Sequence, residues 1–216
     1  HHRGHGGGKR SAAGGPARRP MSLRGRQGWI FDLDGTLALP VHDFDGLREA
    51  LGLPQGVLIL EYLASRPAPE AKALGARLEA LEAELIAQCR PQPGIREALE
   101  ALRDRGGHLG VVTRNSVANA HLTLAQLGLD DLFAPSAVLG RESAEPKPSP
   151  DALHQLLRQW RLGPDASVML GDHGLDLAAG RAAGVATVHF TADCPERWPE
   201  LTDHLLPHWS HLGALL

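Results

Sequence analysis

Residues 29–37 read Trp-Ile-Phe-Asp-Leu-Asp-Gly-Thr-Leu, an apolar run that ends in two aspartates and a glycine. The apolar part is typical of a buried strand. Because side chains alternate along a strand, Asp32 and Asp34 share one face and Leu33 lies on the other. Two carboxylates at one strand end repel each other unless a cation or a shared proton lies between them. The stretch therefore indicates either a solvated strand-to-turn junction or a site for Mg²⁺ and phosphate chemistry.

Composition limits the classes of protein that this chain can belong to. Its 216 residues suit one domain with a modest insertion, and the 43% hydrophobic content includes only 4% aromatic residues, so Leu, Ala and Val build the core. A net charge of −3 gives no electrostatic case for nucleic acid or for an acidic membrane surface. No apolar run approaches the roughly 20 residues that span a bilayer. Cys89 and Cys194 lie far apart without a secretory signature, which favours reduced thiols and a cytoplasmic location.

Residues 1–26 differ from the rest of the chain in composition. They are rich in Gly, Arg, Ala and His and cannot bury enough apolar surface to fold. We expect a disordered N-terminal extension or a tag here, with Met21 as the candidate start of the natural chain.

Helical periodicity dominates the segment between the aspartate-rich strand and Pro91. The spacing of apolar residues predicts helices over 43–51, 55–64 and 69–88. In the last of these, the leucines from Leu74 to Leu85 form the core stripe and Glu82 lies on the polar side. We therefore expect an α-helical cap at 41–90, able to act as a lid, on a core made of 27–40 and 91–216.

Strands and helices alternate through the rest of the chain. Apolar runs predict strands at 108–112, 167–170 and 185–190, a short strand within 132–139, helices between them, and a last short strand and helix within 203–216. Alternating βα units of this size predict an α/β fold with a parallel sheet covered by helices on both faces.

Polar residues stand directly after the predicted strands, in a loop that opens toward the same edge, or at the start of the helix that follows. Ligands of such sheets bind beyond the carboxyl ends of the strands, so these side chains are expected to converge. The set consists of four carboxylates, one hydroxyl and one ammonium: Asp32, Asp34, Thr113, Lys147, Asp172 and Asp176.

This set suits phosphoryl transfer through an aspartyl-phosphate. Asp32 is the expected nucleophile, and Asp34 the acid that protonates the leaving oxygen and later deprotonates water. Thr113 and Lys147 would hold the non-bridging oxygens, and Lys147 would also restrain Asp32. Mg²⁺, with Asp172 among its oxygen ligands and Asp176 nearby, would offset the negative charge.

Four segments, taken together and in order, resemble the haloacid dehalogenase superfamily of phosphohydrolases. They are 32–37 (Asp-Leu-Asp-Gly-Thr-Leu), Thr113, Lys147 with the proline after it, and 171–176 (Gly-Asp-His-Gly-Leu-Asp). The resemblance covers roughly 27–192. It implies a Rossmann-like core with a small helical cap of the phosphoglycolate phosphatase-like subgroup. It also implies Mg²⁺ held by Asp32, the Asp34 carbonyl and Asp172, with Asp176 helping directly or through water.

Two departures from that pattern bear on the substrate. His173 stands where close relatives often carry Ser, and the first motif is followed by Ala-Leu-Pro at 38–40 rather than by a further polar residue. The cap is also short, which makes a larger phosphomonoester or a broad substrate range plausible. The expected activity is a Mg²⁺-dependent phosphomonoesterase acting on a small phosphorylated metabolite of the phosphoglycolate or sugar phosphate type, in a monomer or small homo-oligomer.

Plainer interpretations accompany each of these residues. Asp172 and Asp176 could serve only as helix-capping residues, and the candidate substrate contacts Arg114 and Asn115 could belong to a solvated loop. His42, Asp43 and His173 are further candidate contacts. The histidines at 204, 208 and 211 are not expected to form a metal site, because Pro207 interrupts their spacing.

Of the rival functions, a phosphomutase stays open, and the residues argue against the others. A dehalogenase typically lacks an acid at the position of Asp34, whereas a phosphomutase would use the same acids. A phospho-acceptor switch that is not an enzyme would draw its acids from different strands, and a pure binding protein would not need every one of these groups.

Overall fold

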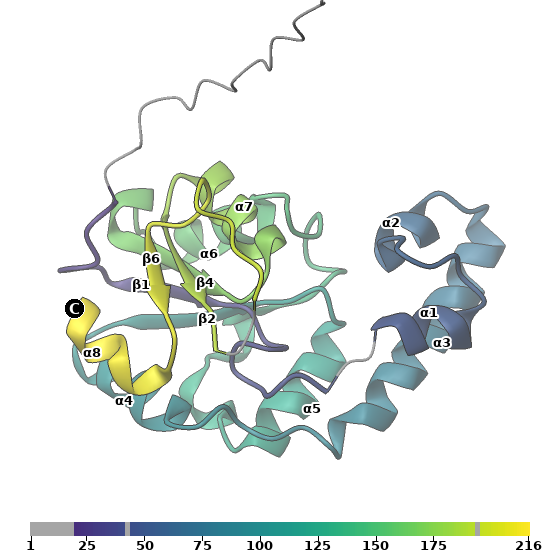
Figure 1. The fold of residues 1–216 in the computed structure, drawn as a ribbon, viewed down its shortest axis with the longest axis horizontal. Helices are drawn as coiled ribbons and strands as arrows, with labels where there is room; N and C mark the ends of the chain where they lie inside the picture. Colours follow the sequence, from purple (N-terminus) through teal and green to yellow (C-terminus); the bar gives the residue numbers. More distant parts are fainter. Residues whose placement is uncertain (1–19, 42–43, 193–194) are drawn as a thin grey trace, which may run out of the picture.

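A computed structural model of the protein describes residues 20–41, 44–192 and 195–216. The first 19 residues of the expected N-terminal extension, the candidate contacts His42 and Asp43, and Cys194 lie outside the described residues. Figure 1 shows a core of strands and helices with three further helices, α1, α2 and α3, set to one side of it.

The core is built on one parallel sheet. Its strand order is β3-β2-β1-β4-β5-β6, and every neighbouring pair is parallel. The order places β1 in the interior of the sheet, with Phe31 opposite Val111 of β2 on one side and Leu170 of β4 on the other. The strands are β1 Gly28–Phe31, β2 His108–Val112, β3 Val138–Leu139, β4 Ser167–Gly171, β5 Ala186–Phe190 and β6 His204–Leu206.

Helices cover both faces of this sheet (Figure 1). They are α4 Ile95–Asp104, α5 Val117–Leu127, α6 Asp151–Trp160, α7 Gly174–Ala183 and α8 Leu212–Leu215. Alternate residues of β1 divide the core, because Phe31 packs with α4, α5 and α8 whereas Ile30 packs with α6 and α7. The predicted doubly wound α/β fold is confirmed.

Two of the predicted elements are short in the structure. The short strand expected within 132–139 is β3, which has only two residues and is preceded by the 3₁₀ turns Asp130–Leu132 and Pro135–Ala137. Pro135 has no N–H to give to a sheet, which favours a turn over a strand there. The helix expected over 55–64 is α2 Ile59–Ala64, because Gly56 has a φ of +76° and breaks the helical path before it.

The stretch expected to form a cap holds three helices, α1 Phe44–Leu51, α2 and α3 Ala68–Ile86. They enclose a small apolar cluster of their own, in which Leu78 is 2% exposed. Along α3 the burial differs from the expected leucine stripe. Glu82, predicted on the polar side, is buried, since it faces an arginine of the core described below.

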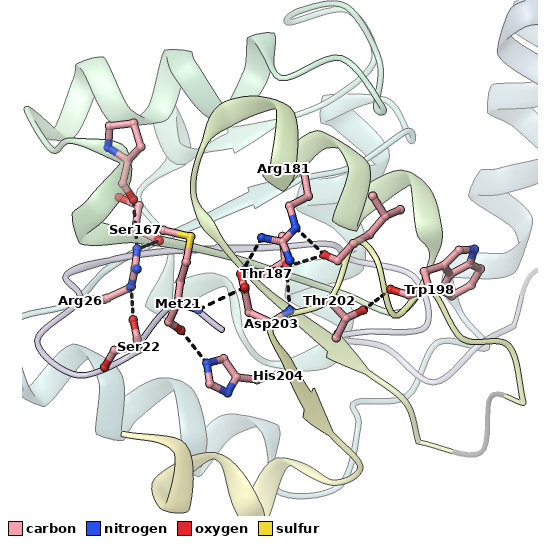
Figure 2. Close-up of polar contacts among 12 residues, drawn as sticks. Met21, Ser22, Arg26, Ser167, Arg181, Thr187, Trp198, Thr202, Asp203 and His204 are labelled. Atoms are coloured by element: carbon pink, nitrogen blue, oxygen red, sulfur yellow. Dashed lines mark hydrogen bonds and ion pairs between the residues drawn. The ribbon is translucent and has the colours of Figure 1, made fainter. Parts of the chain in front are cut away.

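Residues 20–26 are part of the fold, which corrects the expected boundary of the N-terminal extension at residue 26. Leu23 is 2% exposed and belongs to the main apolar cluster. The Met21 N–H donates to Asp203 Oδ1 over 3.2 Å, and Arg26 donates to the Ser167 carbonyl over 2.6 Å (Figure 2). These contacts could not be predicted from the sequence, because their acceptors are more than 100 residues away along the chain.

Asp203 is the buried acceptor of this network, and its side chain is 1% exposed. It accepts the Thr187 N–H over 3.0 Å and lies 3.2 Å from Arg181 Nη1, so one carboxylate joins α7, β5 and the segment at Met21 (Figure 2). Removing one member of a buried charge pair leaves the other groups without compensation.

Replacing Asp203 with alanine is expected to lower the free energy of unfolding by about 3 kcal/mol, because a buried guanidinium and two backbone N–H groups lose their acceptor. Denaturant unfolding monitored by circular dichroism measures this loss. Glu200→Ala, in the exposed stretch just before, is the matched control and should change stability by less than about 0.5 kcal/mol. Equal effects of the two substitutions would contradict the role assigned to Asp203.

Candidate functional site

The carboxyl ends of β1 and β4 bring two of the predicted acids together. Asp32 directly follows β1, and its N–H donates to the Leu170 carbonyl of β4 over 3.0 Å. Asp172 directly follows β4. The strand order reverses between these two neighbours, since β1 connects onward to β2 and β4 connects onward to β5. Crevices at such reversals are the usual ligand sites of open α/β sheets.

Two glycines allow the acids to approach this closely. A Cβ on Gly35, whose φ is +82°, would lie 2.2 Å from Asp172 Oδ2. A Cβ on Gly171 would lie 2.4 Å from Asp176 Oδ2. Any larger residue at either position would push a carboxylate away from its place. Thr36 adds a direct link, because its hydroxyl donates to Asp172 Oδ1 over 3.1 Å.

Lys147 is the cation of the site, and its side chain is 2% exposed. The ammonium lies 2.5 Å from Asp32 Oδ1 and 2.7 Å from Asp176 Oδ1, and it donates to the Val112 carbonyl over 2.7 Å. Burial alone would lower the pKa of Lys147, but the Asp176 and Asp32 carboxylates outweigh it and raise that pKa. The ammonium therefore stays charged and holds Asp32 in position.

The acids outnumber this single ammonium, so the site suits a cation. Asp32, Asp172 and Asp176 each offer a carboxylate oxygen, and these atoms lie within 4.8 Å of one another. Burial and the neighbouring Asp176 together raise the pKa of Asp172 to about 7. Burial and the surrounding carboxylates, Asp176 first, also raise the pKa of Asp32 against the opposing effect of Lys147. A divalent cation with oxygen ligands fits this donor set and would relieve the repulsion.

The loop after β2 carries the remaining predicted site residues. Thr113 is buried, and its hydroxyl oxygen accepts the Asn115 N–H over 3.1 Å. Asn115 is buried as well, and its Oδ1 accepts the Ser116 N–H over 3.2 Å. Arg114 points toward the cap, where it pairs with Glu61 at 2.6 Å. The side chains of Asn115 and Arg114 are therefore held by protein groups. The solvated-loop interpretation does not apply to them.

One cavity unites the predicted residues. It has a volume of about 230 Å³ and is lined from the core side by Asp32, Asp34, Thr113, Arg114, Asn115, Lys147, Asp172 and Asp176. From the cap side Arg48, Leu58, Leu78 and Glu82 line the same cavity. No sequence motif predicted that these cap residues line the cavity, because their position depends on how α1 and α3 pack.

The candidate His173 is exposed at the rim of the cavity and caps α7. Its Nδ1 accepts the Leu175 N–H over 3.2 Å, and the ring centroid lies 5.3 Å from that of Trp198. In the described part of the chain, His204, His208 and His211 do not gather into a group that could hold a metal ion.

Comparisons with known proteins identify relatives of this chain. The family model described as "Haloacid dehalogenase-like hydrolase" matches residues 43–190. A phosphoglycolate phosphatase of Haemophilus influenzae is 32% identical over 74% of this chain and 84% of its own length. An uncharacterized hydrolase of Saccharomyces cerevisiae is also 32% identical, over 74% of each chain.

The chain belongs to the haloacid dehalogenase-like hydrolase family.

A solved structure supports the fold of this family member. The crystal structure of a predicted phosphoglycolate phosphatase from Haemophilus somnus matches with a TM-score of 0.71 at 23% identity, and the match covers 90% of this chain and 99% of that one. The resemblance stated from the four motifs is thus confirmed. Among the described helices of this family member, we find none with the length and apolar character that crossing a bilayer requires.

Magnesium is expected to raise the melting temperature more at pH 8 than at pH 6. Below its pKa of about 7 the Asp172 carboxyl holds a proton that a metal ion must displace, so metal binding weakens as the pH falls. Thermal unfolding with and without Mg²⁺ at the two pH values measures the effect, and Asp172→Asn should abolish it. Equal shifts at both pH values would contradict a metal site at Asp172.

Without metal, the protein should lose stability as the pH rises toward 7. In the folded state the pKa of Asp172 lies near 7, whereas an unfolded aspartate titrates near about 4. The folded state therefore binds the extra proton between these values, and stability falls as the pH rises from about 4 to about 7.

Proposed function

We propose that this protein is a Mg²⁺-dependent phosphomonoesterase that works through a phosphorylated Asp32 and acts on a small phosphorylated metabolite. The observation that carries the proposal is the grouping at one sheet edge of Asp32, its ammonium partner Lys147 and the acids Asp172 and Asp176. The similar phosphoglycolate phosphatase of Haemophilus influenzae supports the choice of a phosphate ester.

In the first step, the Asp32 carboxylate attacks the phosphorus atom and the bond to the ester oxygen breaks. Lys147 keeps this carboxylate in place. The Lys147 ammonium would also neutralise negative charge on the phosphoryl oxygens, and the Thr113 hydroxyl would donate a hydrogen bond to one of them. A bound Mg²⁺ would supply the further positive charge that lets an anion approach a phosphate dianion. Asp32, Asp172 and Asp176 would hold it, with the carbonyl of Asp34 as a further ligand.

Asp34 is proposed to move the protons. Its side chain lines the same cavity as Asp32, one pleat further along the chain. In its acid form it would give a proton to the departing ester oxygen. The resulting carboxylate would then take a proton from the water that attacks the phosphorus of phospho-Asp32, which releases inorganic phosphate and regenerates both aspartates.

The cavity supports a small substrate. Its volume of about 230 Å³ lies below the roughly 300–1,000 Å³ of pockets for drug-sized ligands. Phosphoglycolate or a sugar phosphate is the class that we propose, with Asn115 as a contact near the phosphoryl group and Arg48 of the cap near the leaving group. A cytoplasmic setting is part of the proposal, consistent with the free, buried Cys89.

Wild-type protein is expected to release inorganic phosphate from some members of a panel of phosphate esters, and only when Mg²⁺ is present. Asp32→Asn should lower this turnover by at least about a thousandfold, because an amide cannot serve as the nucleophile. A phosphate assay with and without EDTA measures both effects. Inactivity of the intact protein on every ester, or equal activity of the Asn variant, would contradict the proposal. Transfer of phosphate to another hydroxyl of the substrate would indicate a mutase instead.

The proton-transfer role of Asp34 predicts a dependence on the leaving group. Nitrophenolate departs without a proton, so Asp34→Asn should still release about one equivalent of it per protein from p-nitrophenyl phosphate before turnover slows. An alkyl phosphate should show no such burst. Rapid-mixing absorbance and quenched-flow experiments follow the two substrates. Equal losses for both esters in the first turnover would rule out Asp34 as the acid.

A further inference from the structure

We propose that Arg114 is a positioning residue that couples closure of the cap to the placement of Lys147, with Glu61 as its partner on the cap. The inference rests on the proposed function, since it concerns how the same site is held ready for catalysis. It also replaces the expectation that Arg114 is a substrate contact.

The guanidinium of Arg114 has two polar partners on opposite sides. One terminal nitrogen, Nη2, lies 2.6 Å from the Glu61 carboxylate on α2 of the cap. The other, Nη1, donates a short hydrogen bond to the backbone carbonyl of Lys147 in the core. Both terminal nitrogens of the guanidinium already bond to protein groups. The side chain therefore links the cap to the core, and a bound ligand is not needed to hold it.

The Lys147 carbonyl is a sensitive place for such a bond, because the same residue carries the ammonium of the site. Its Nζ is held by Asp32 and Asp176, while its backbone oxygen is held by Arg114. Arg114 itself directly follows Thr113, another residue of the cavity wall. A change in the position of the guanidinium would therefore reach the backbone on both sides of the phosphoryl-binding region.

The cap is attached to the core in two different ways. Helix α3 is held firmly, since Glu82 accepts two bonds of 2.9 Å from Arg141 and both side chains are at most 15% exposed. Glu79 reinforces it by accepting from Ser116 over 3.3 Å and from Asn119 over 3.2 Å. Buried pairs of this kind are costly to break.

Helix α2 has a weaker attachment. Among the polar contacts between described residues, the bond from Arg114 to Glu61 is the one that ties α2 to the core. The Glu61 side chain is 46% exposed, and pairs of this exposure contribute about 0.2–1 kcal/mol. Partial burial would raise the pKa of Glu61, but the bond from Arg114 outweighs it and lowers that pKa. The pair thus forms at neutral pH and is weak enough to open.

Two substitutions separate the two bonds of Arg114. Glu61→Gln weakens only the contact with the cap, so it should raise KM about threefold with kcat nearly unchanged. Arg114→Gln also loses the guanidinium arm that reaches the Lys147 carbonyl, because the shorter, uncharged amide cannot span both partners, and it should lower kcat at least about tenfold in addition. Asp131→Asn is the control, because it breaks an exposed pair with Arg96 that belongs entirely to the core. It should change neither constant.

A charge reversal tests the coupling to Lys147 directly. The double variant Glu61→Arg with Arg114→Glu restores a pair between cap and core, so KM should return toward the wild-type value. A glutamate at 114 has no donor for the Lys147 carbonyl, so kcat should stay low. In the wild type, added salt should raise KM toward the value of Glu61→Gln, because salt screens the ion pair. In the Glu61→Gln variant, amide hydrogen exchange in α2 should be faster than in the wild type.

These outcomes distinguish the inference from the proposed function. A wild type that hydrolyses esters while the Arg114→Gln and Asp131→Asn variants behave alike would overturn the inference and leave the phosphatase intact. Equal kcat in Arg114→Gln and Glu61→Gln would overturn the coupling to Lys147. Should Arg114→Gln fail to fold, Arg114→Lys keeps the charge and loses the two-armed geometry, and the same comparison applies.

Discussion

The ion pair between Lys147 and Asp32 is the interaction on which the site depends. Several carboxylates meet at the edge of the sheet, and burial raises the pKa of Asp32 and Asp172. A single buried ammonium reaches both Asp32 and Asp176 and limits the repulsion. Without that cation the acids could not stay this close and ionised. The remaining negative charge suits a divalent cation, and in the proposed reaction that cation would in turn offset the charge of a phosphate.

The fold serves this arrangement by bringing distant segments to one edge. Neighbouring parallel strands deliver Asp32 and Asp172 side by side, and Gly35 and Gly171 leave room for the acids around them. The C-terminal part of the chain adds support, because the Trp209 indole donates to the Thr36 carbonyl over 3.1 Å. The cap lines the cavity from the other side with residues of α1, α2 and α3.

The sequence was most informative where local chemistry is unusual. Paired acids at a strand end and the proline-flanked Lys147 predicted residues that the structure brings into one cavity. It was least informative where long-range packing decides. Glu82 carries no sign that it is buried, since its partner Arg141 lies in a distant segment. The sequence also did not predict that Glu61 pairs with Arg114, or that Asp203 accepts a hydrogen bond from Met21.

The central claim is that the Asp32 carboxylate carries the phosphoryl group during turnover. The most direct measurement is acid quenching of the protein during hydrolysis of a ³²P-labelled ester, followed by mapping of the labelled peptide. The account predicts label on Asp32 that appears within the first turnover and disappears when unlabelled substrate is added in excess. Steady hydrolysis with no label on the protein, or with label on another residue, would contradict it.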